Sequence, residues 1–245
     1  MEQTQQPVQP TQPQYSFPTE EVTLPSKGLL YPEGSPLRSG KITMKYMTAK
    51  EEDILTNQNY IKNGTVIDKL LQSLIVDMTK VEDLLIGDKN AVLVAARILG
   101  YGQDYTFKYP HPDTGVEEEL TIDLTEAEDK VIDESKMING QNEFEFELPT
   151  SKLLITFKLL TQADEKLIEQ ELKGLKKINK NASPELTTRL KHVIQSVNGD
   201  RTQKTIREFI DNKFLARDSR AFRSYLDTIM PDIDLTFDLT FDDGT

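Results

Sequence analysis

The chain has 245 residues, a hydrophobic fraction of 37% and no cysteine, which excludes disulfides, thiolate nucleophiles and cysteine-based zinc sites. Its net charge is −12, and its one basic block, residues 152–223, lies between acidic blocks that can neutralise it, so we expect no nucleic-acid binding. No apolar run reaches the roughly 18 residues of a membrane span and the start lacks a signal peptide, so we expect no membrane contact and a cytosolic location.

The N-terminal region divides into two segments. Residues 1–18 are rich in glutamine and proline, which predicts a disordered leader. Residues 19–40 read as an extended arm: "TEEVTL" favours a short edge strand, and the three prolines and two glycines of "LPSKGLLYPEGSPL" exclude a helix or a central strand. An apolar cluster nevertheless lies in its middle, so the segment either docks into a partner or covers the core of its own domain.

Residues 41–160 predict an α+β module. "KITMKYM" alternates as a half-buried strand, and Thr48 with Glu51 has the spacing of a capping box that begins a helix. Further amphipathic helices follow at "VIDKLLQSLIV" and "DKNAVLVAARILGYG".

Two hairpins are expected in the second half of this module. The first is "YTFKY" and "EEELTID" around a turn at residues 113–115, and the second is "NEFEFEL" with "KLLITFKLL". We expect the two hairpins to pair into one antiparallel sheet. Glu143, Glu145 and Glu147 would then project in a row toward basic helices of the same chain or toward a basic partner.

Residues 161–231 predict a helical module. Amphipathic helices are expected over "QADEKLIEQELKGLKKINK", "ELTTRLKHVIQSVNG", "QKTIREFIDNKFL" and "DSRAFRSYLDTIM". Residues 232–245 alternate as a C-terminal strand that ends on an Asp243-Gly244 turn signal with no second strand, which suggests a truncated chain.

A search for chemistry finds no catalytic constellation, so we expect no enzyme, no cofactor and no metal site. His111 is expected to be an exposed turn residue and His192 a polar helix position. No phosphate-binding loop or serine nucleophile elbow is present. Arg217, Arg220 and Arg223 share one helix edge, either as the rim of an amphipathic helix or as a protein-docking edge.

Five stretches carry a resemblance to a known family. They are "EVTLPSKGLLYPEGSPLRSGKITMKYMTAKEEDILTNQNYIKNGTVIDKLLQSLIVD", "LLIGDKNAVLVAARILGYG", "ELKGLKKIN", "SPELTTRLKHVIQSVNGD" and "IREFIDNKFLARDSRAFR". Together they resemble the baseplate hub subunit and hub assembly family of T4-type tailed phages over residues 20 to 241. Relatives continue past "FDDGT" through another strand, and this chain does not.

The resemblance implies a non-enzymatic late protein, made in the host cytoplasm, that assembles the contractile-tail baseplate through contacts with other tail and hub proteins. It would be either a hub subunit that stays in the virion or a transient, chaperone-like factor. The candidate interaction residues are Leu24, Pro25, Ser26, Lys27, Gly28, Leu29, Leu30, Tyr31, Arg217, Arg220 and Arg223. The rival hypothesis is a cell-wall hydrolase, which needs two carboxylates facing a cleft, one of them in apolar surroundings.

Overall fold

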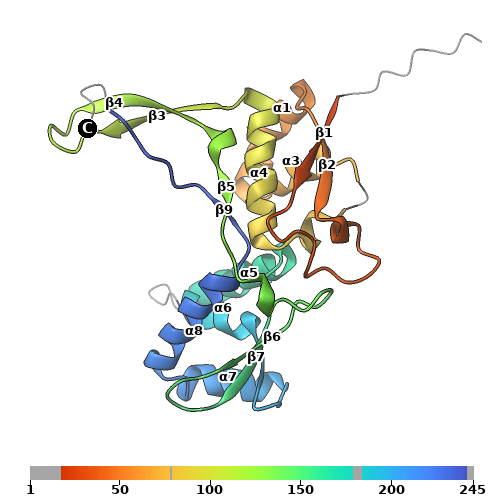
Figure 1. Ribbon diagram of the computed structural model, residues 1–245, viewed down its shortest axis with the longest axis vertical. Helices are drawn as coiled ribbons and strands as arrows, with labels where there is room; N and C mark the ends of the chain where they lie inside the picture. Colours follow the sequence, from red (N-terminus) through yellow and green to blue (C-terminus); the bar gives the residue numbers. More distant parts are fainter. Residues whose placement is uncertain (1–17, 78, 179–183, 242–245) are drawn as a thin grey trace, which may run out of the picture.

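Two groups of elements, each with its own sheet, form the α+β fold that the computed structural model describes for residues 18–77, 79–178 and 184–241 (Figure 1). The first group contains β1 (Thr19–Thr23), η1 (Pro36–Ser39), β2 (Lys41–Lys45), α1 (Ala49–Thr56), α2 (Gln58–Asn63), α3 (Val66–Leu74), η2 (Val81–Asp83) and α4 (Ile86–Tyr101). The second contains β6 (Phe144–Glu147), β7 (Leu154–Phe157), α5 (Gln162–Ile178), α6 (Glu185–Val193), β8 (Ile194–Val197), α7 (Gln203–Asn212) and α8 (Ala216–Ile229).

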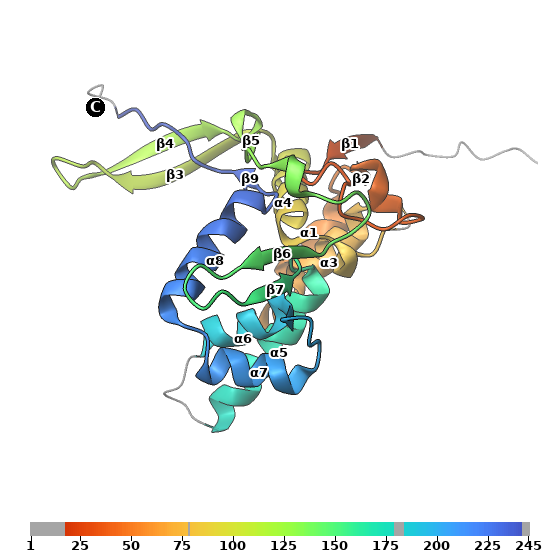
Figure 2. The ribbon, with the colours of Figure 1, turned by 60° about the horizontal axis from the view of Figure 1, so that its bottom comes forward.

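The connecting segments form a separate hairpin and a short two-stranded ladder. They contain β3 (Asp104–Pro110), β4 (Glu117–Asp123), η3 (Leu124–Glu126), β5 (Glu128–Asp129), η4 (Glu134–Lys136) and β9 (Ile233–Asp234). The β3–β4 hairpin projects from the body of the molecule in two views (Figures 1 and 2). Residues 1–17 of the predicted leader and the Asp243-Gly244 turn lie outside the described residues.

The capping box at the start of α1 is confirmed and is part of a larger polar cluster. The carboxylate of Glu51 accepts hydrogen bonds from the backbone N–H and the hydroxyl of Thr48, at 2.9 and 2.6 Å. It also accepts from Lys45 Nζ at 2.9 Å and from Ser73 Oγ at 2.6 Å. Glu51 is fully buried, so this carboxylate ties β2, α1 and α3 together.

The hairpin of β6 and β7 is confirmed, but its sheet differs from the prediction. The sheet order is β6-β7-β8, and β3 and β4 form a two-stranded sheet of their own. The apolar face of β6 and β7 is covered by α8 instead: the Phe157 and Phe222 rings lie 4.9 Å apart, and those of Phe146 and Tyr225 lie 4.7 Å apart. The prediction that the two hairpins share one sheet is therefore wrong.

The helix predicted across "ELTTRLKHVIQSVNG" ends earlier than expected. Helix α6 stops at Val193, and the next four residues form β8, which pairs antiparallel with β7. Ile194 is fully buried, and the hydroxyls of Thr156 and Ser196 share a buried 2.8 Å hydrogen bond across the two strands. Tertiary pairing with a strand far away in the sequence overrides the local helical pattern.

Glu145 and Glu147 of β6 are exposed, as their alternation with phenylalanine predicts, and Glu143 directly before the strand is half-buried. Glu143 forms a two-bond ion pair with Arg201, at 3.0 and 2.6 Å, and Glu147 lies 3.8 Å from Lys152. Both partners are within the chain, but Arg201 lies in the loop before α7 and Lys152 in the β6–β7 turn, so neither glutamate meets a basic helix as predicted.

The C-terminal strand is shorter than predicted. Ile233 and Asp234 pair with β5, whereas residues 235–241 run extended along the projecting hairpin without entering a sheet. One connected cluster of buried apolar side chains contains residues of both groups, Leu24 and Ile229 among them, so the two groups share one core.

Glu51 generates a prediction about pH. Burial raises its pKa, but the bonds from Lys45, Ser73 and Thr48 outweigh this and lower it from 4.5 to about 2. Because the folded-state pKa is lowered, ionised Glu51 stabilises the fold above about pH 4.5, and that contribution is lost as the pH falls toward about 2. In urea titrations, Glu51→Gln should lower the free energy of unfolding at pH 7, and the deficit should shrink across this range.

The matched control is Glu52→Gln, because Glu52 is the exposed neighbour in the same helical turn. Its free energy of unfolding should follow that of the unaltered protein at every pH. A deficit of Glu51→Gln that stays constant from pH 7 to pH 3 would contradict the role assigned to the ionised carboxylate.

Candidate protein-interaction surfaces

The segment of residues 24–31 lies in the core of its own domain. Leu24, Leu30 and Tyr31 are buried among the residues of the shared apolar cluster. Gly28 is also buried, with φ +76°. Of the two alternatives for this segment, the geometry supports the one in which it covers its own domain.

One buried carboxylate fixes this segment to the first turn of α4. Asp88 accepts hydrogen bonds from Ser26 N at 2.9 Å, from Ser26 Oγ at 2.6 Å and from Tyr31 Oη at 2.6 Å. Tyr31 Oη in turn accepts from Leu85 N at 2.9 Å. Turn hydrogen bonds such as Lys27 N to Leu24 O, at 2.8 Å, pair much of the segment's backbone, and Asp88 supplies the acceptor that Ser26 and the Tyr31 hydroxyl need.

The electrostatics of this network follow from its burial. Burial raises the pKa of Asp88, and the hydrogen bonds from Ser26 and Tyr31 offset part of that rise. Burial and the neighbouring Asp88 charge raise the pKa of Tyr31, which therefore stays a hydrogen-bond donor. Asp88 has the apolar surroundings that the rival hydrolase hypothesis requires, but it is fully buried and its bonds go to its own chain.

Lys27 and Leu29 are the more exposed members of the predicted interaction segment, while Pro25 is buried with its neighbours. Lys27 is exposed and forms an ion pair with Glu134, and Leu29 is half-buried. A partner that approaches this face of the folded chain meets chiefly the Lys27 side chain and its acidic neighbour.

The structure brings the three predicted arginines together on α8. Arg217, Arg220 and Arg223 are exposed on one edge of the helix, while Phe222 is buried against β7. None of the three forms an ion pair with a carboxylate of the described residues. We call this set the arginine stripe.

Asp218 holds the first turn of α8 in place beneath the arginine stripe. Its carboxylate accepts from the backbone N–H groups of Thr150 and Ser151 at 2.7 and 3.0 Å, and these bonds, against the opposing effect of burial, lower its pKa. The stripe is therefore carried by a helix that is fixed to the β6–β7 turn.

A second exposed surface, which the sequence analysis did not single out, lies on the β3–β4 hairpin. Tyr105, Phe107 and Tyr109 alternate along β3 and therefore share one face of the hairpin. Tyr105 is 44% exposed, Tyr109 is 48% exposed, and Val116 near the tip is 61% exposed. The hairpin was predicted from its strand-like stretches and its turn, but the exposure of this face depends on whether another element covers it, which local sequence does not encode.

Arg97 at the end of α4 sets the direction in which the hairpin leaves the body. Its guanidinium donates to the carbonyl oxygens of Gly102 and Asp104 at 2.9 and 3.0 Å. The guanidinium carbon lies 5.3 Å from the Tyr101 ring centre and 5.6 Å from that of Tyr105. The hairpin thus projects from a supported base.

The two histidines have structural roles. His111 is buried, so the expectation of an exposed turn residue is wrong: its Nδ1 accepts from the backbone N–H of Asp113 at 3.1 Å, and its ring meets that of Phe241 at 4.8 Å. His192, half-buried on α6, lies 3.0 Å from Glu171. The residues that the structure describes contain no cluster of metal-ligating side chains and no helix long and apolar enough to cross a membrane.

Comparison with known proteins identifies the family. The family model described as T4 bacteriophage base plate protein matches residues 18–241, which is nearly all of the described chain. The chain belongs to this family and is thus a T4-type phage baseplate protein. No curated protein and no solved structure matches the chain.

The fixed position of residues 24–31 generates a stability prediction. A Cβ added at Gly28 would lie 2.4 Å from the carbonyl oxygen of Arg38 and 2.7 Å from the nitrogen of Gly40, both backbone atoms. Gly28→Ala should therefore lower the free energy of unfolding by about 2 to 5 kcal/mol, from left-handed backbone strain plus overpacking.

Gly34 provides the matched control, because its φ is +86° and nothing lies within 4 Å of an added Cβ. Gly34→Ala should cost only the backbone strain, about 1 to 2 kcal/mol. Equal losses for both variants in urea denaturation would show that the segment moves freely away from Arg38.

Proposed function

We propose that this protein acts in assembly of the baseplate hub through protein–protein contacts, without an enzymatic step of its own. It does so either as a hub subunit or as a transient, chaperone-like assembly factor. Membership of the base plate family and the resemblance to hub subunits and hub assembly proteins support this role.

The projecting hairpin is the observation that carries the proposal. Tyr105 and Tyr109 stay 44% and 48% exposed on an arm outside the core, even though Arg97 contacts the Tyr105 ring and Phe241 contacts that of Tyr109. Tyrosine is among the residues that dominate interface energies, because it buries a large rigid ring and still offers a hydroxyl.

The arginine stripe supports a second contact. It lies on α8, in the second group of elements, whereas the hairpin starts next to α4 and extends away from the first group (Figures 1 and 2). Exposed arginines that no described carboxylate pairs with favour an acidic surface on the protein that they meet. Two separated surfaces allow the protein to hold two subunits at once.

The test is capture of co-expressed baseplate proteins of the same phage by the Tyr105→Ser/Tyr109→Ser double variant. A tyrosine at an interface centre contributes about 2 kcal/mol, so each loss should weaken binding about thirtyfold. Tyr46→Ser is the matched control, because Tyr46 is also exposed but lies on the first group of elements. It should retain full capture, with all variants melting at similar temperatures; equal capture by the double variant would contradict the proposal.

Two further measurements decide between the forms of the proposal and its rival. Mass spectrometry of purified virions beside complexes from infected lysate separates a subunit present in both from a factor present in the lysate alone. Purified protein should not degrade cell wall. Degradation of cell wall by the purified protein would replace this proposal with the hydrolase.

A further inference from the structure

The outer edge of β4 carries unpaired backbone groups. In the hairpin register, His111 N donates to Val116 O and Leu124 N donates to Gln103 O, which marks these as hydrogen-bonded pairs. Antiparallel pairs alternate, so the pair of Thr106 and Thr121 is of the non-hydrogen-bonded kind. The N–H and C=O groups of Thr121 therefore point away from β3, and no described residue accepts or donates there.

The two edges of the hairpin differ in how they are protected. The β3 edge carries Lys108 and Pro110, and the carbonyl oxygen of Asp104 on this edge accepts a hydrogen bond from Arg97. Lysine and proline are the residues with which natural sheets block further strand pairing. The β4 edge, Glu117–Asp123, has neither, so it is the open edge.

A groove of about 510 Å³ lies beside this edge, with residues 236–238 on its other side. From Leu235 to Phe241 the chain is extended, and among the described residues its backbone forms one hydrogen bond, from Thr236 N to Asp234 Oδ1 at 2.9 Å. Phe241 anchors the far end of this segment against His111 and Tyr109. Two extended backbones with free polar groups therefore border the groove.

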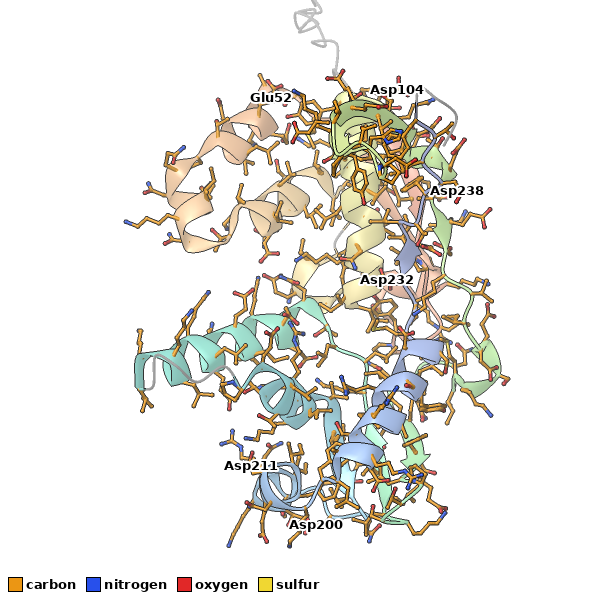
Figure 3. All side chains as sticks on the ribbon, turned by 90° about the vertical axis from the view of Figure 1, so that its left-hand side faces the viewer. Glu52, Asp104, Asp200, Asp211, Asp232 and Asp238 are labelled. Atoms are coloured by element: carbon orange, nitrogen blue, oxygen red, sulfur yellow. The ribbon has the colours of Figure 1, made fainter. Side chains whose placement is uncertain are left out.

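The charge of the groove indicates what enters it. Four carboxylates line it and no basic side chain does; the four are Asp104, Asp123, Glu126 and Asp238. Asp104 and Asp238 lie at the end of the molecule opposite Asp200 and Asp211 (Figure 3). The Asp123 carboxylate already accepts hydrogen bonds from Thr125 N and Gln103 Nε2. The other three carboxylates form no ion pair with described residues.

Resting on the proposed function, we infer that another baseplate protein adds a β-strand with alternating basic side chains to the open edge of β4, in this groove. Strand addition satisfies the free backbone groups, and the basic side chains neutralise the carboxylates. A second copy of this chain does not fit, because its exposed arginine stripe lies on a helix and the outer strand β1 carries Glu20 and Glu21.

The first test uses the full chain and a nine-residue peptide of alternating lysine and valine, measured by titration calorimetry. The peptide should bind, and raised salt should weaken it. Two control peptides separate the causes: one alternates glutamate and valine, and one keeps the lysines but has N-methylated amides on one edge. Both should bind at least about tenfold more weakly, because each lacks either the charge or the backbone bonds.

The second test compares the same change on the two edges of the hairpin. Thr121→Pro removes the outward N–H of β4, whereas Thr106→Pro removes the outward N–H of the strand opposite, at the paired position. Thr121→Pro should weaken the lysine–valine peptide about tenfold and Thr106→Pro less than about twofold, with both variants retaining their melting temperature. Glu126→Gln/Asp238→Asn, which leaves the backbone intact, should also weaken binding and flatten its salt dependence.

The inference is overturned if the lysine–valine peptide does not bind, if its N-methylated form binds equally well, or if Thr106→Pro and Thr121→Pro weaken it alike. If one of these results occurs while Tyr105→Ser/Tyr109→Ser still loses capture, only the inferred strand addition is contradicted. The proposed function is then still supported. If Thr121→Pro loses peptide binding but the tyrosine variant captures its partners normally, the strand addition is supported and the proposed role of the tyrosines is contradicted.

Discussion

The fold depends on one buried carboxylate. Asp88 holds Ser26 and Tyr31 against the first turn of α4, and this places Leu24 and Leu30 in the apolar core. Without Asp88, the N–H and hydroxyl of Ser26 and the hydroxyl of Tyr31 would lose their buried acceptor, at a cost of about 1 to 3 kcal/mol each. The other end of the same helix carries Arg97, which supports the hairpin. One helix thus connects the buried anchor of the N-terminal segment to the exposed arm.

Local periodicity was sufficient for the elements whose partners lie close in sequence. The alternation in β2, the capping box at Thr48 and the apolar stripes of the helices all predicted what the structure shows. The predicted secondary structure was wrong where pairing with a distant segment determines it. Residues 194–197 were predicted as helix, but they form β8 because they pair with β7, some 40 residues earlier in the chain. The sequence also left open whether residues 24–31 cover their own domain or dock into a partner. Asp88, which fixes the segment, lies 62 residues from Ser26, so local sequence does not show this contact.

The candidate surfaces divide in the same way. The arginine stripe could be predicted because Arg217, Arg220 and Arg223 follow helical spacing and remain exposed in the fold. The hairpin surface could not, because "YTFKY" reads equally as a covered or an uncovered strand. His111 shows the converse: a histidine between two prolines reads as exposed, yet Phe241, 130 residues later, covers its ring.

The separation of charge gives the molecule a direction in an electric field. The hairpin and its flanks carry an excess of carboxylates, and α8 at some distance carries three arginines that form no ion pair with described residues, so the protein has a permanent dipole moment. A charged neighbour exerts a torque on such a dipole before any atoms touch, and within about 10 Å at 0.1 M salt this turns the molecule toward one face. In a crowded assembly with many subunits, rotational alignment of this kind shortens the search for the productive orientation.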